Sequence, residues 1–351
     1  MGTSPDDFGA PFAIGRVLIP NRVVLAPMAG LTNSAYRRHL KAHGAGLVTT
    51  EMVSAHGLIH GNKRTDDYLG FAPEERPIAV QLFGDTPEAM AHAARLVLEG
   101  RSGHAGDLSA VPDMLDINMG CPVRKVVRTG AGSALLADPD RAVAIAAAVV
   151  RVASEHGVPV TIKLRSGLQE GERAAVDLAP RLEEVGVAAL GVHPRATSQH
   201  YRGNADHTIT EAVVRAVGIP VIVSGDVMSV RSAQAIVQAT GAAAVMVARG
   251  ATGDPWLVGS LLAGEDLPRP PLSEVVADLR VLLALVIDEM GETRGLKWMW
   301  RLIGWYLRPS RVPVAIIDRL RALPGAGSLD EALAALGEGE GTPAGGEVGP
   351  R

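Results

Sequence analysis

Short apolar stretches recur along the chain and alternate with longer segments whose apolar residues are spaced as on a helix. Each apolar stretch is too short for a helix and too uniformly apolar for a strand with one face in water. Such runs are typical of parallel strands that are buried on both faces. They occupy residues 22–28, 47–52, 78–84, 114–120, 160–165, 189–195, 221–226 and 244–250.

The intervening segments carry helix start and stop signals. Residues 85–100 place Pro87 in the first turn and Gly100 just past the end. Residues 138–157 have the same form and end at Gly157. Eight strand–helix units in succession predict an α/β fold of the (β/α)8 TIM-barrel type, with a doubly wound open sheet as the structural alternative.

The pattern changes after Gly250, and a proline-rich stretch follows. Helical spacing resumes at Ser273, and Ser328 with Glu331 has the spacing of a capping box at the start of a last short helix. The closing residues are rich in glycine and glutamate, which is typical of disorder. We therefore predict a barrel domain over residues 1–263, a linker over 264–272, a small all-helical domain over 273–336 and a disordered tail over 337–351.

Composition and charge restrict the class of protein. The chain is 47% hydrophobic and carries a net charge of −4, which indicates a globular protein. It contains no apolar run long enough to cross a bilayer, and its first residues do not form a secretory signal. One cysteine and no signal predict a cytoplasmic protein. A nucleic-acid surface, if the chain has one, must be local because the overall charge is slightly acidic.

Polar residues fall at the ends of the predicted strands, where a TIM barrel places its functional groups. Any one of them is explained as a satisfied structural residue, but six at the same relative position indicate a site. They are Gln81, Asn118, Lys163, His193, Asp226 and Arg249.

These residue types suit a flavin mononucleotide. Residues 224–227 and 248–253 follow the last two strands and have the small side chains that let backbone N–H groups bind a phosphate. Gln81 can donate and accept at the edge of a heterocycle, and Lys163 can stabilise negative charge on a reduced flavin. No GxGxxG motif follows the first strand, which argues against a Rossmann dinucleotide site.

Cys121, the only cysteine, follows the fourth strand directly. It has no partner for an internal disulfide and no second cysteine with which to share a zinc ion. A packing residue and a reactive thiol remain the two interpretations. His56 and His60 have the i, i+4 spacing of metal ligands, but without an acidic or cysteine partner for them we favour an ordinary surface or loop role and predict no metal site.

Nine stretches together resemble the tRNA-dihydrouridine synthases, most closely their bacterial branch. The most specific is "DINMGCPVRKVVRTGAGSALL" at residues 116–136. The resemblance runs from about residue 12 to residue 323. The other stretches are residues 25–37, 50–58, 80–84, 162–167, 192–195, 224–227, 247–256 and 296–307.

The resemblance implies an FMN enzyme that uses NADPH to reduce the C5=C6 bond of particular uridines in tRNA. The hydride passes from flavin N5 to C6, and Cys121 donates the proton to C5. A thiol is mostly protonated at neutral pH and suits this role of general acid. The implied flavin contacts are Pro27, Met28, Ala29, Gln81, Lys163, His193, Ser224, Gly225, Asp226, Ala248 and Arg249. The implied substrate contacts are Asn118 (which can also hold the flavin), Arg124, Lys125, Arg195 and Arg301.

The target base must leave the tRNA stack to reach a flavin inside a barrel, so a cationic surface is expected near the site. Arg124, Lys125 and Arg128 follow the cysteine, and residues 294–321 carry seven Lys or Arg against one acid, Asp318. We predict that these basic residues of the helical domain bind tRNA. The tryptophans of the same segment are expected to form its core, and they are Trp298, Trp300 and Trp305. Nothing in the sequence implies a membrane or a protein partner.

Three positions depart from the pattern of the family. Ser224-Gly225-Asp226 stands where Asn-Gly-Asp is common, Ala248-Arg249 where Gly-Arg is common, and Arg301-Leu302 where Lys-His is frequent. The first two departures leave the backbone donors in place. Two other functions remain open: an FMN barrel oxidoreductase for a free small molecule such as dihydroorotate, and a non-catalytic RNA-binding protein. The first leaves the cationic helical segment unexplained, and the second leaves the flavin residues unexplained.

Overall fold

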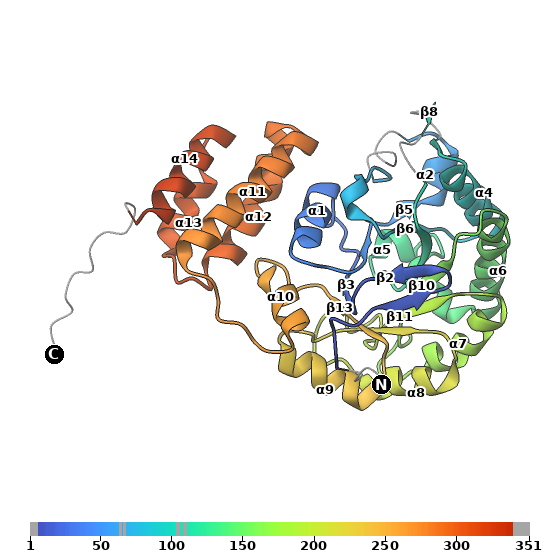
Figure 1. Ribbon diagram of the computed structural model, residues 1–351. Coiled ribbons are helices and arrows are strands. Elements are labelled where there is room, and N and C mark those ends of the chain that lie inside the picture. The colour runs from blue at the N-terminus through green and yellow to red at the C-terminus, as the bar shows by residue number, and fades with distance from the viewer. Residues whose placement is uncertain (1–5, 63–64, 66–67, 103–105, 108–110, 340–351) are drawn as a thin grey trace. The chain divides into compact units, whose positions relative to one another are not determined.

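Within residues 6–62, 65, 68–102, 106–107 and 111–339, which the computed structural model describes, eight parallel strands form a barrel (Figure 1). Val245 of the last strand pairs with Val23 of the first, and Leu25 N donates to Leu47 O at 2.9 Å to complete the ring. The predicted TIM barrel is therefore confirmed, and the open sheet is wrong. The strands are β3 (Val23–Leu25), β4 (Val48–Thr49), β6 (Ile78–Phe83), β9 (Met114–Met119), β10 (Val160–Arg165), β11 (Ala189–His193), β12 (Val221–Ser224) and β13 (Ala244–Val247).

Helices follow the strands with the predicted caps. Thr86 and Asp138 accept hydrogen bonds from the first turns of α4 and α6, and Gly100 and Gly157 follow the ends of these helices with positive φ angles of 68° and 63°. A layer of buried aliphatic side chains lies between helices and strands. The helices up to residue 263 are α1 (Ser34–Ala42), α2 (Ala55–Ile59), α4 (Pro87–Leu98), α5 (Arg124–Val127), α6 (Pro139–Glu155), α7 (Ala174–Glu184), α8 (His207–Ala216), α9 (Val230–Thr240) and α10 (Trp256–Ala263).

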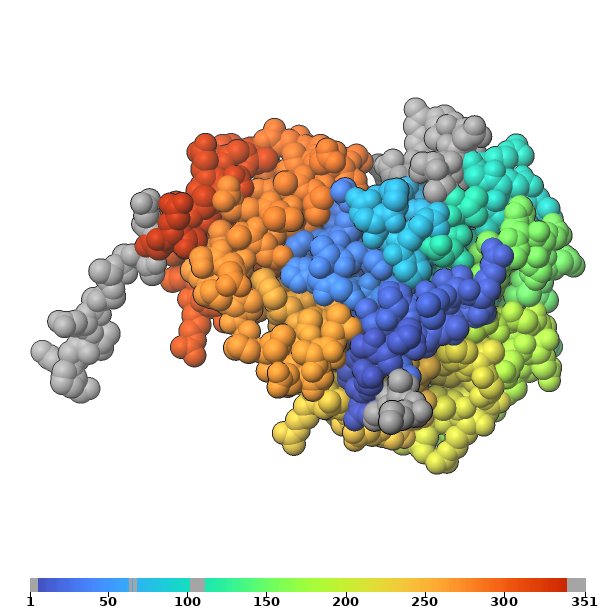
Figure 2. All heavy atoms as spheres, viewed as in Figure 1, coloured from blue at the N-terminus to red at the C-terminus, as the bar shows by residue number. Residues whose placement is uncertain are grey.

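A hairpin that the sequence did not predict covers the amino-terminal end of the barrel. Its strands are β1 (Phe12–Ile14) and β2 (Val17–Ile19), drawn in dark blue in Figures 1 and 2. Ile14 and Ile19 are fully buried in the same cluster as Met114, Ala189 and Ala244, the first residues of three strands. The hairpin therefore forms an apolar plug at the amino-terminal end of the barrel. The polar groups lie at the opposite end, where the strands finish.

The remaining short elements lie in connections between strands and helices. They are β5 (Val53–Ser54), η1 (Pro73–Glu75), β7 (Arg101–Ser102), β8 (Gly106–Asp107) and η2 (Gly132–Ala137).

The chain divides into two compact units. Among the described residues, the barrel unit comprises those of 6–251 and 257–267, and the helical unit comprises those of 252–256 and 268–339. The second boundary falls inside the predicted linker, and α11 begins at Leu272, one residue before Ser273. The helices are α11 (Leu272–Met290), α12 (Glu292–Leu307), α13 (Val314–Arg321) and α14 (Ala326–Gly337).

Two details of the helical unit differ from the prediction. The last helix begins at Ala326, and Ser328 is its third residue, bonded to Gly325 rather than to Glu331, so the predicted capping box is wrong. Trp298 is buried as expected, but the side chain of Trp305 is 47% exposed. The predicted tail lies outside the described residues from 340 onward. Among the described residues, no helix is both long and apolar enough to span a membrane.

Candidate active site

Three polar side chains at the carboxyl end of the barrel form a chain of hydrogen bonds. Gln81 of β6 donates from Nε2 to Asp116 Oδ2 at 2.6 Å, and Asn118 donates from Nδ2 to Gln81 Oε1 at 2.9 Å. Thr161 of β10 donates to Asp116 Oδ1 at 2.5 Å. All four side chains belong to neighbouring strands, because β9 pairs with β6 on one side and with β10 on the other.

Cys121 lies at the top of this chain. Asn118 Oδ1 accepts the backbone N–H groups of Gly120 and Cys121 at 3.1 and 2.9 Å, which fixes the turn after β9. Ser133 N donates to Cys121 O at 3.1 Å. A Cβ at Gly132, whose φ is 64°, would lie only 2.9 Å from Cys121 O. The glycine of the "GAGSALL" segment therefore lets this segment pack directly beneath the cysteine turn.

The thiol is held in its protonated form. Cys121 is partly buried, and this burial raises the pKa of the thiol above its ordinary value. The hydrogen bond from the Val123 backbone and the charges of Arg165 and Lys163 oppose the shift without reversing it. At neutral pH the thiol therefore carries its proton.

A small cavity lies inside the barrel below these groups. Residues at or beside all eight strands line it. Its polar lining residues are Lys163, Asp116, Thr161 and Thr49, and Pro27 and Met246 are among its apolar ones. Burial, with the charge of Arg165, lowers the pKa of Lys163 to about 8. Lys163 is therefore mostly charged at pH 7 and loses its charge just above that pH.

His193, at the end of β11, is a neutral group. Burial lowers its pKa to about 2, and the charges of Lys163 and Arg165 act in the same direction. Arg195 Nη1 lies 3.5 Å from His193 Nε2. The imidazole can donate or accept a hydrogen bond here but carries no charge at physiological pH.

Arg195 holds the turn that follows β12. Its Nη2 donates to both carboxylate oxygens of Asp226, at 2.6 and 2.9 Å, and to Gly203 O at 2.7 Å. Burial works against the charge of Asp226, but the hydrogen bonds from Ala205 N and Arg195 keep the pKa of Asp226 below its usual value. Arg195 is 1% exposed, and its guanidinium also donates to Arg202 O at 3.3 Å.

Two loops with closely packed backbone follow β12 and β13. Gly225 and Asp226 have consecutive positive φ angles of 107° and 59°, and a Cβ at Gly225 would lie 3.0 Å from Ala205 Cβ. A Cβ at Gly250 would lie 2.4 Å from Val227 O. Backbone turned in this way presents N–H groups to an anion. Buried Ser224, half-buried Ala248 and exposed Arg249 lie at the same ends.

The loop after β3 is held by side chains that do not line the cavity. Met28 N donates to Thr32 Oγ1 at 3.0 Å, and Arg37 donates to Thr32 O at 2.7 Å while forming a buried ion pair with Glu75 at 2.5 Å. Pro27 and Met28 are half-buried and Ala29 is exposed. The loop thus offers a small, firmly supported surface.

The structure adds residues that the sequence did not single out. Arg165 donates to Gly120 O at 2.9 Å and to His200 O at 2.8 Å, which ties the cysteine turn to the loop after β11. Tyr201 of that loop is 57% exposed and has two guanidinium groups near its ring, Arg165 at 5.3 Å and Arg249 at 5.5 Å from the ring centre. Thr161 and Arg165 could have been found because they lie two positions either side of Lys163 on one strand face; Tyr201 gave no signal.

The predicted substrate residues outside the cavity lie on the surface. Arg124 and Lys125 are exposed on α5, directly after the cysteine turn. Arg301 is exposed on α12 of the helical unit.

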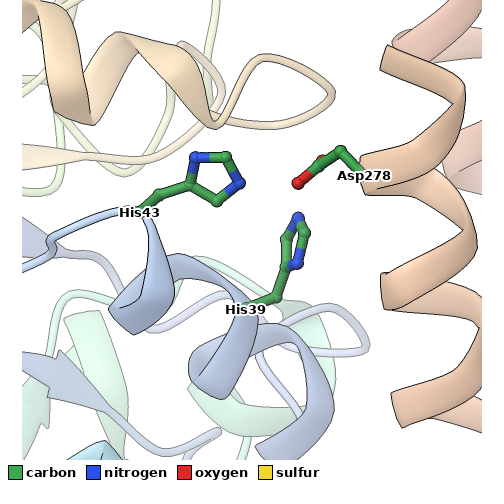
Figure 3. A group of neighbouring side chains, drawn as sticks. All are labelled: His39, His43 and Asp278. Carbon is green, nitrogen blue, oxygen red and sulfur yellow. The ribbon is translucent and has the colours of Figure 1, made fainter. Parts of the chain in front are cut away.

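Histidine pairs do not form an evident metal centre within the described part of the barrel unit. His39 and His43 come from α1 and its C-cap, with ring centres 4.9 Å apart, and Asp278, also drawn in Figure 3, belongs to α11 of the helical unit. His56 has an acidic partner that the sequence did not reveal, because Asp85 Oδ1 lies 2.7 Å from His56 Nε2. Among the described residues, the ligand atoms of His56, His60 and Asp85 do not come close enough together to share one metal ion.

Comparison with known proteins shows where related chains occur. The dihydrouridine synthase (Dus) family model matches residues 24–316. The tRNA-dihydrouridine synthase B of Pseudomonas aeruginosa is 37% identical over 298 residues, which are 84% of this chain and 86% of that protein. A probable tRNA-dihydrouridine synthase of Rhizobium leguminosarum bv. phaseoli is 37% identical over 328 residues, 89% and 98% of the two chains.

Solved structures share the barrel. An old yellow enzyme homologue from Zymomonas mobilis superposes with a TM-score of 0.55 at 13% identity, over 75% of this chain and 94% of that one. A 2-naphthoyl-CoA reductase complex gives a TM-score of 0.56 at 12% identity, over 75% and 53%. At these identities the likeness is one of fold.

Proposed function

The chain belongs to the dihydrouridine synthase family, and we propose that this flavin-dependent tRNA-modifying enzyme holds FMN at the carboxyl ends of its strands and takes its electrons from NADPH. The observation that carries the proposal is the turn after β9, where Asn118 holds the backbone of Cys121 at 2.9 Å above a cavity walled by Lys163. A proton donor and a cation therefore lie on one strand-end surface.

The residues of the cavity and its loops fit FMN. A flat ring is matched by the supported surface of Pro27, Met28 and Ala29, and the polar edge by Gln81 and Lys163. Gly225 and Gly250 let the backbone after β12 and β13 pack closely against neighbouring segments, and backbone N–H groups of such glycine-containing loops can bind a phosphate. The other residues at the phosphate end are Ser224, Asp226, Ala248 and Arg249. Neutral His193, on β11, lies between this phosphate end and Lys163 on β10.

When bound, FMN supplies the hydride that reduces the C5=C6 bond of a uracil. Cys121 donates a proton from Sγ to C5 of the same base and recovers it from solvent. Its raised pKa keeps the proton on sulfur until the base becomes basic enough to take it. Arg165 and Lys163 favour the thiolate that remains, because their charges lower the pKa of Cys121.

Asn118 and Arg195 act in different ways in this proposal. Asn118 holds the cysteine turn with its oxygen and faces the bound base or the flavin from the same position. Arg195 holds the Asp226 turn from below and supports the phosphate site. This placement favours a positioning role for Arg195 in place of the predicted contact with substrate.

A second surface fits the sugar–phosphate backbone of tRNA. Four cations and one tryptophan follow each other on α12 and its C-cap at steps of three, four, four and three residues, which places them on one helix face. All five are exposed, while the other face of α12 buries residues such as Trp298, Leu302 and Tyr306. We name this face the α12 stripe; it consists of Arg294, Lys297, Arg301, Trp305 and Arg308. Arg124 and Lys125 supply further charge beside the cysteine turn.

Mass spectrometry of tRNA digests tests the proposal. Dihydrouridine-free tRNA is incubated with FMN-loaded protein and NADPH or NADH, using either the wild type or Cys121→Ala. We expect a gain of two daltons on particular uridines with the wild type and NADPH, and a large reduction with the variant. A yellow protein that oxidises NADPH but leaves tRNA unchanged would favour a small-molecule substrate. A protein that binds tRNA but takes up no flavin would favour the non-catalytic alternative. We infer a cytoplasmic location from this substrate.

A further inference from the structure

The hydrogen bonds below Cys121 run in one direction, because each group donates to the next, and they end at the side chain of Asp116. From top to bottom, backbone N–H groups donate to Asn118, Asn118 donates to Gln81, and Gln81 donates to Asp116. We propose that Asp116 is a positioning residue: its carboxylate sets the orientation of the Gln81 and Asn118 amides and thereby holds the Cys121 turn in its working position. The inference rests on the proposed roles of Gln81 and Cys121.

The argument follows from the donors and acceptors available at each end. A carboxylate accepts only, so the group that Gln81 turns toward Asp116 must be its NH2. Gln81 Oε1 must then face Asn118, whose NH2 donates a hydrogen bond to it at 2.9 Å. The oxygen of Asn118 is left for the N–H groups of Gly120 and Cys121, which can only donate. Each amide has one orientation that satisfies all its neighbours.

Burial gives this choice its weight. Gln81, Asp116 and Asn118 are 1%, 7% and 8% exposed, so an amide turned the wrong way has little water to satisfy it. Burial raises the pKa of the Asp116 carboxyl, and the hydrogen bonds from Gln81 and Thr161, with the charge of Lys163, oppose that rise. The Gln81 NH2 group that Asp116 orients therefore also stabilises the negative charge of the Asp116 carboxylate.

Two substitutions separate orientation from charge. Asp116→Asn removes the charge but can keep an oxygen toward Gln81 if its NH2 faces Thr161. Thr161 Oγ1 can then accept a hydrogen bond from that NH2, because its own hydroxyl hydrogen can be donated to Leu115 O, 3.5 Å away. Asp116→Leu keeps the branched heavy-atom skeleton of aspartate but has no hydrogen-bond acceptor, so nothing at position 116 favours one orientation of the Gln81 amide. Asp116→Ala serves the same purpose if the leucine variant does not fold.

The readout is the rate of alkylation of Cys121 by iodoacetamide in the FMN-loaded protein, measured without NADPH or tRNA. Because Cys121 is the only cysteine, the signal reports this turn alone. We expect Asp116→Leu to raise the rate about threefold to tenfold, the range that corresponds to the loss of one hydrogen bond. Asp116→Asn should stay within about twofold of the wild type, as rescue by the conservative variant requires.

A matched control comes from the other end of the same strand segment. Asp113, just before β9, accepts hydrogen bonds from Arg76 and from Ile78 N. Asp113→Leu tests general loosening of the fold and should leave the alkylation rate unchanged when the protein is assayed well below its melting temperature.

Three results would overturn the inference. An unchanged rate in Asp116→Leu means that Asp116 does not hold the turn. Equal rates in Asp116→Asn and Asp116→Leu mean that the charge, not the orientation, matters. A rise in Asp113→Leu of the same size means that the effect is one of stability. None of these outcomes depends on tRNA reduction, so failure of the inference is distinguishable from failure of the proposed function.

Discussion

The two ends of the barrel are built from the same strands but from different chemistry. On β9 one face carries Met114, then Asp116, then Asn118, and on β11 Ala189 leads to His193 in the same steps of two. The amino-terminal end is an apolar cluster closed by Ile14. The carboxyl end places buried amides and charges around a cavity. Burial supplies stability at one end, and at the other it shifts the pKa values of polar groups such as Lys163 and His193.

The largest expected effect is on chemistry, at the carboxyl end. We expect Cys121→Ala to lower the rate of tRNA reduction about 10²–10⁴-fold, the usual contribution of a general acid. The free energy of unfolding should change little, because the thiol is only partly buried. Single-turnover reduction of tRNA by the NADPH-reduced enzyme measures the first quantity, and urea unfolding measures the second. A variant that keeps the wild-type rate would remove Cys121 from the reaction.

The next effect is on stability, at the amino-terminal end. Ile14→Ala should lower the free energy of unfolding by about 2–5 kcal/mol, because Ile14 is fully buried in the plug. The control is Leu18→Ala on the same hairpin, where the side chain is 68% exposed and the loss should be small. Below its melting temperature Ile14→Ala should reduce tRNA at the wild-type rate. Loss of this rate in folded protein would show that the two ends are not separable.

As pH rises, the loss of the Lys163 charge is expected to lower activity and to raise the free energy of unfolding. The group is charged below about pH 8, so steps that need this cation should slow as pH rises through that value. Its folded pKa lies below the ordinary 10.5, so between about pH 8 and 10.5 the unfolded chain binds a proton that the folded chain lacks. Its contribution to stability therefore rises over this window.

Lys163→Met tests both statements. It should slow tRNA reduction by about a hundredfold at pH 7 and remove the loss of activity centred near pH 8. Urea unfolding of wild type and variant at pH 8 and pH 10 gives the second quantity as a difference between the two proteins. A wild type that gains no stability relative to the variant over this window would contradict the pKa of about 8.

The smallest effects are expected on the α12 stripe of the helical unit, outside the barrel comparison. Arg301→Gln should weaken tRNA binding a few-fold and reduce the slope of log affinity against log salt by about one. The matched control is Arg215→Gln on α8, where an exposed arginine pairs with Glu211. Binding assays at several salt concentrations measure both. An equal change in the two variants would mean that the stripe is not a specific surface.

Much of this arrangement was predictable because the signals are local. The eight apolar stretches match the eight strands, and Pro87 with Gly100 marked the ends of α4 within two residues. The same local rules misplaced the start of α14, since Ser328 bonds back to Gly325 in a helix that had already begun. A capping signal states that a turn is present, but neighbouring turns decide where the helix starts.

The sequence by itself determined the strand–helix order, the polar strand ends and the family resemblance, because periodicity and motif spacing are properties of neighbouring residues. The tertiary structure decided which of these groups meet. It placed Asp116 between Gln81 and Thr161, joined Arg195 to Asp226, and brought Asp85 to His56. These contacts join residues about 30 or more positions apart along the chain. Closure of the barrel and packing of its connections create them, and no local pattern encodes that geometry.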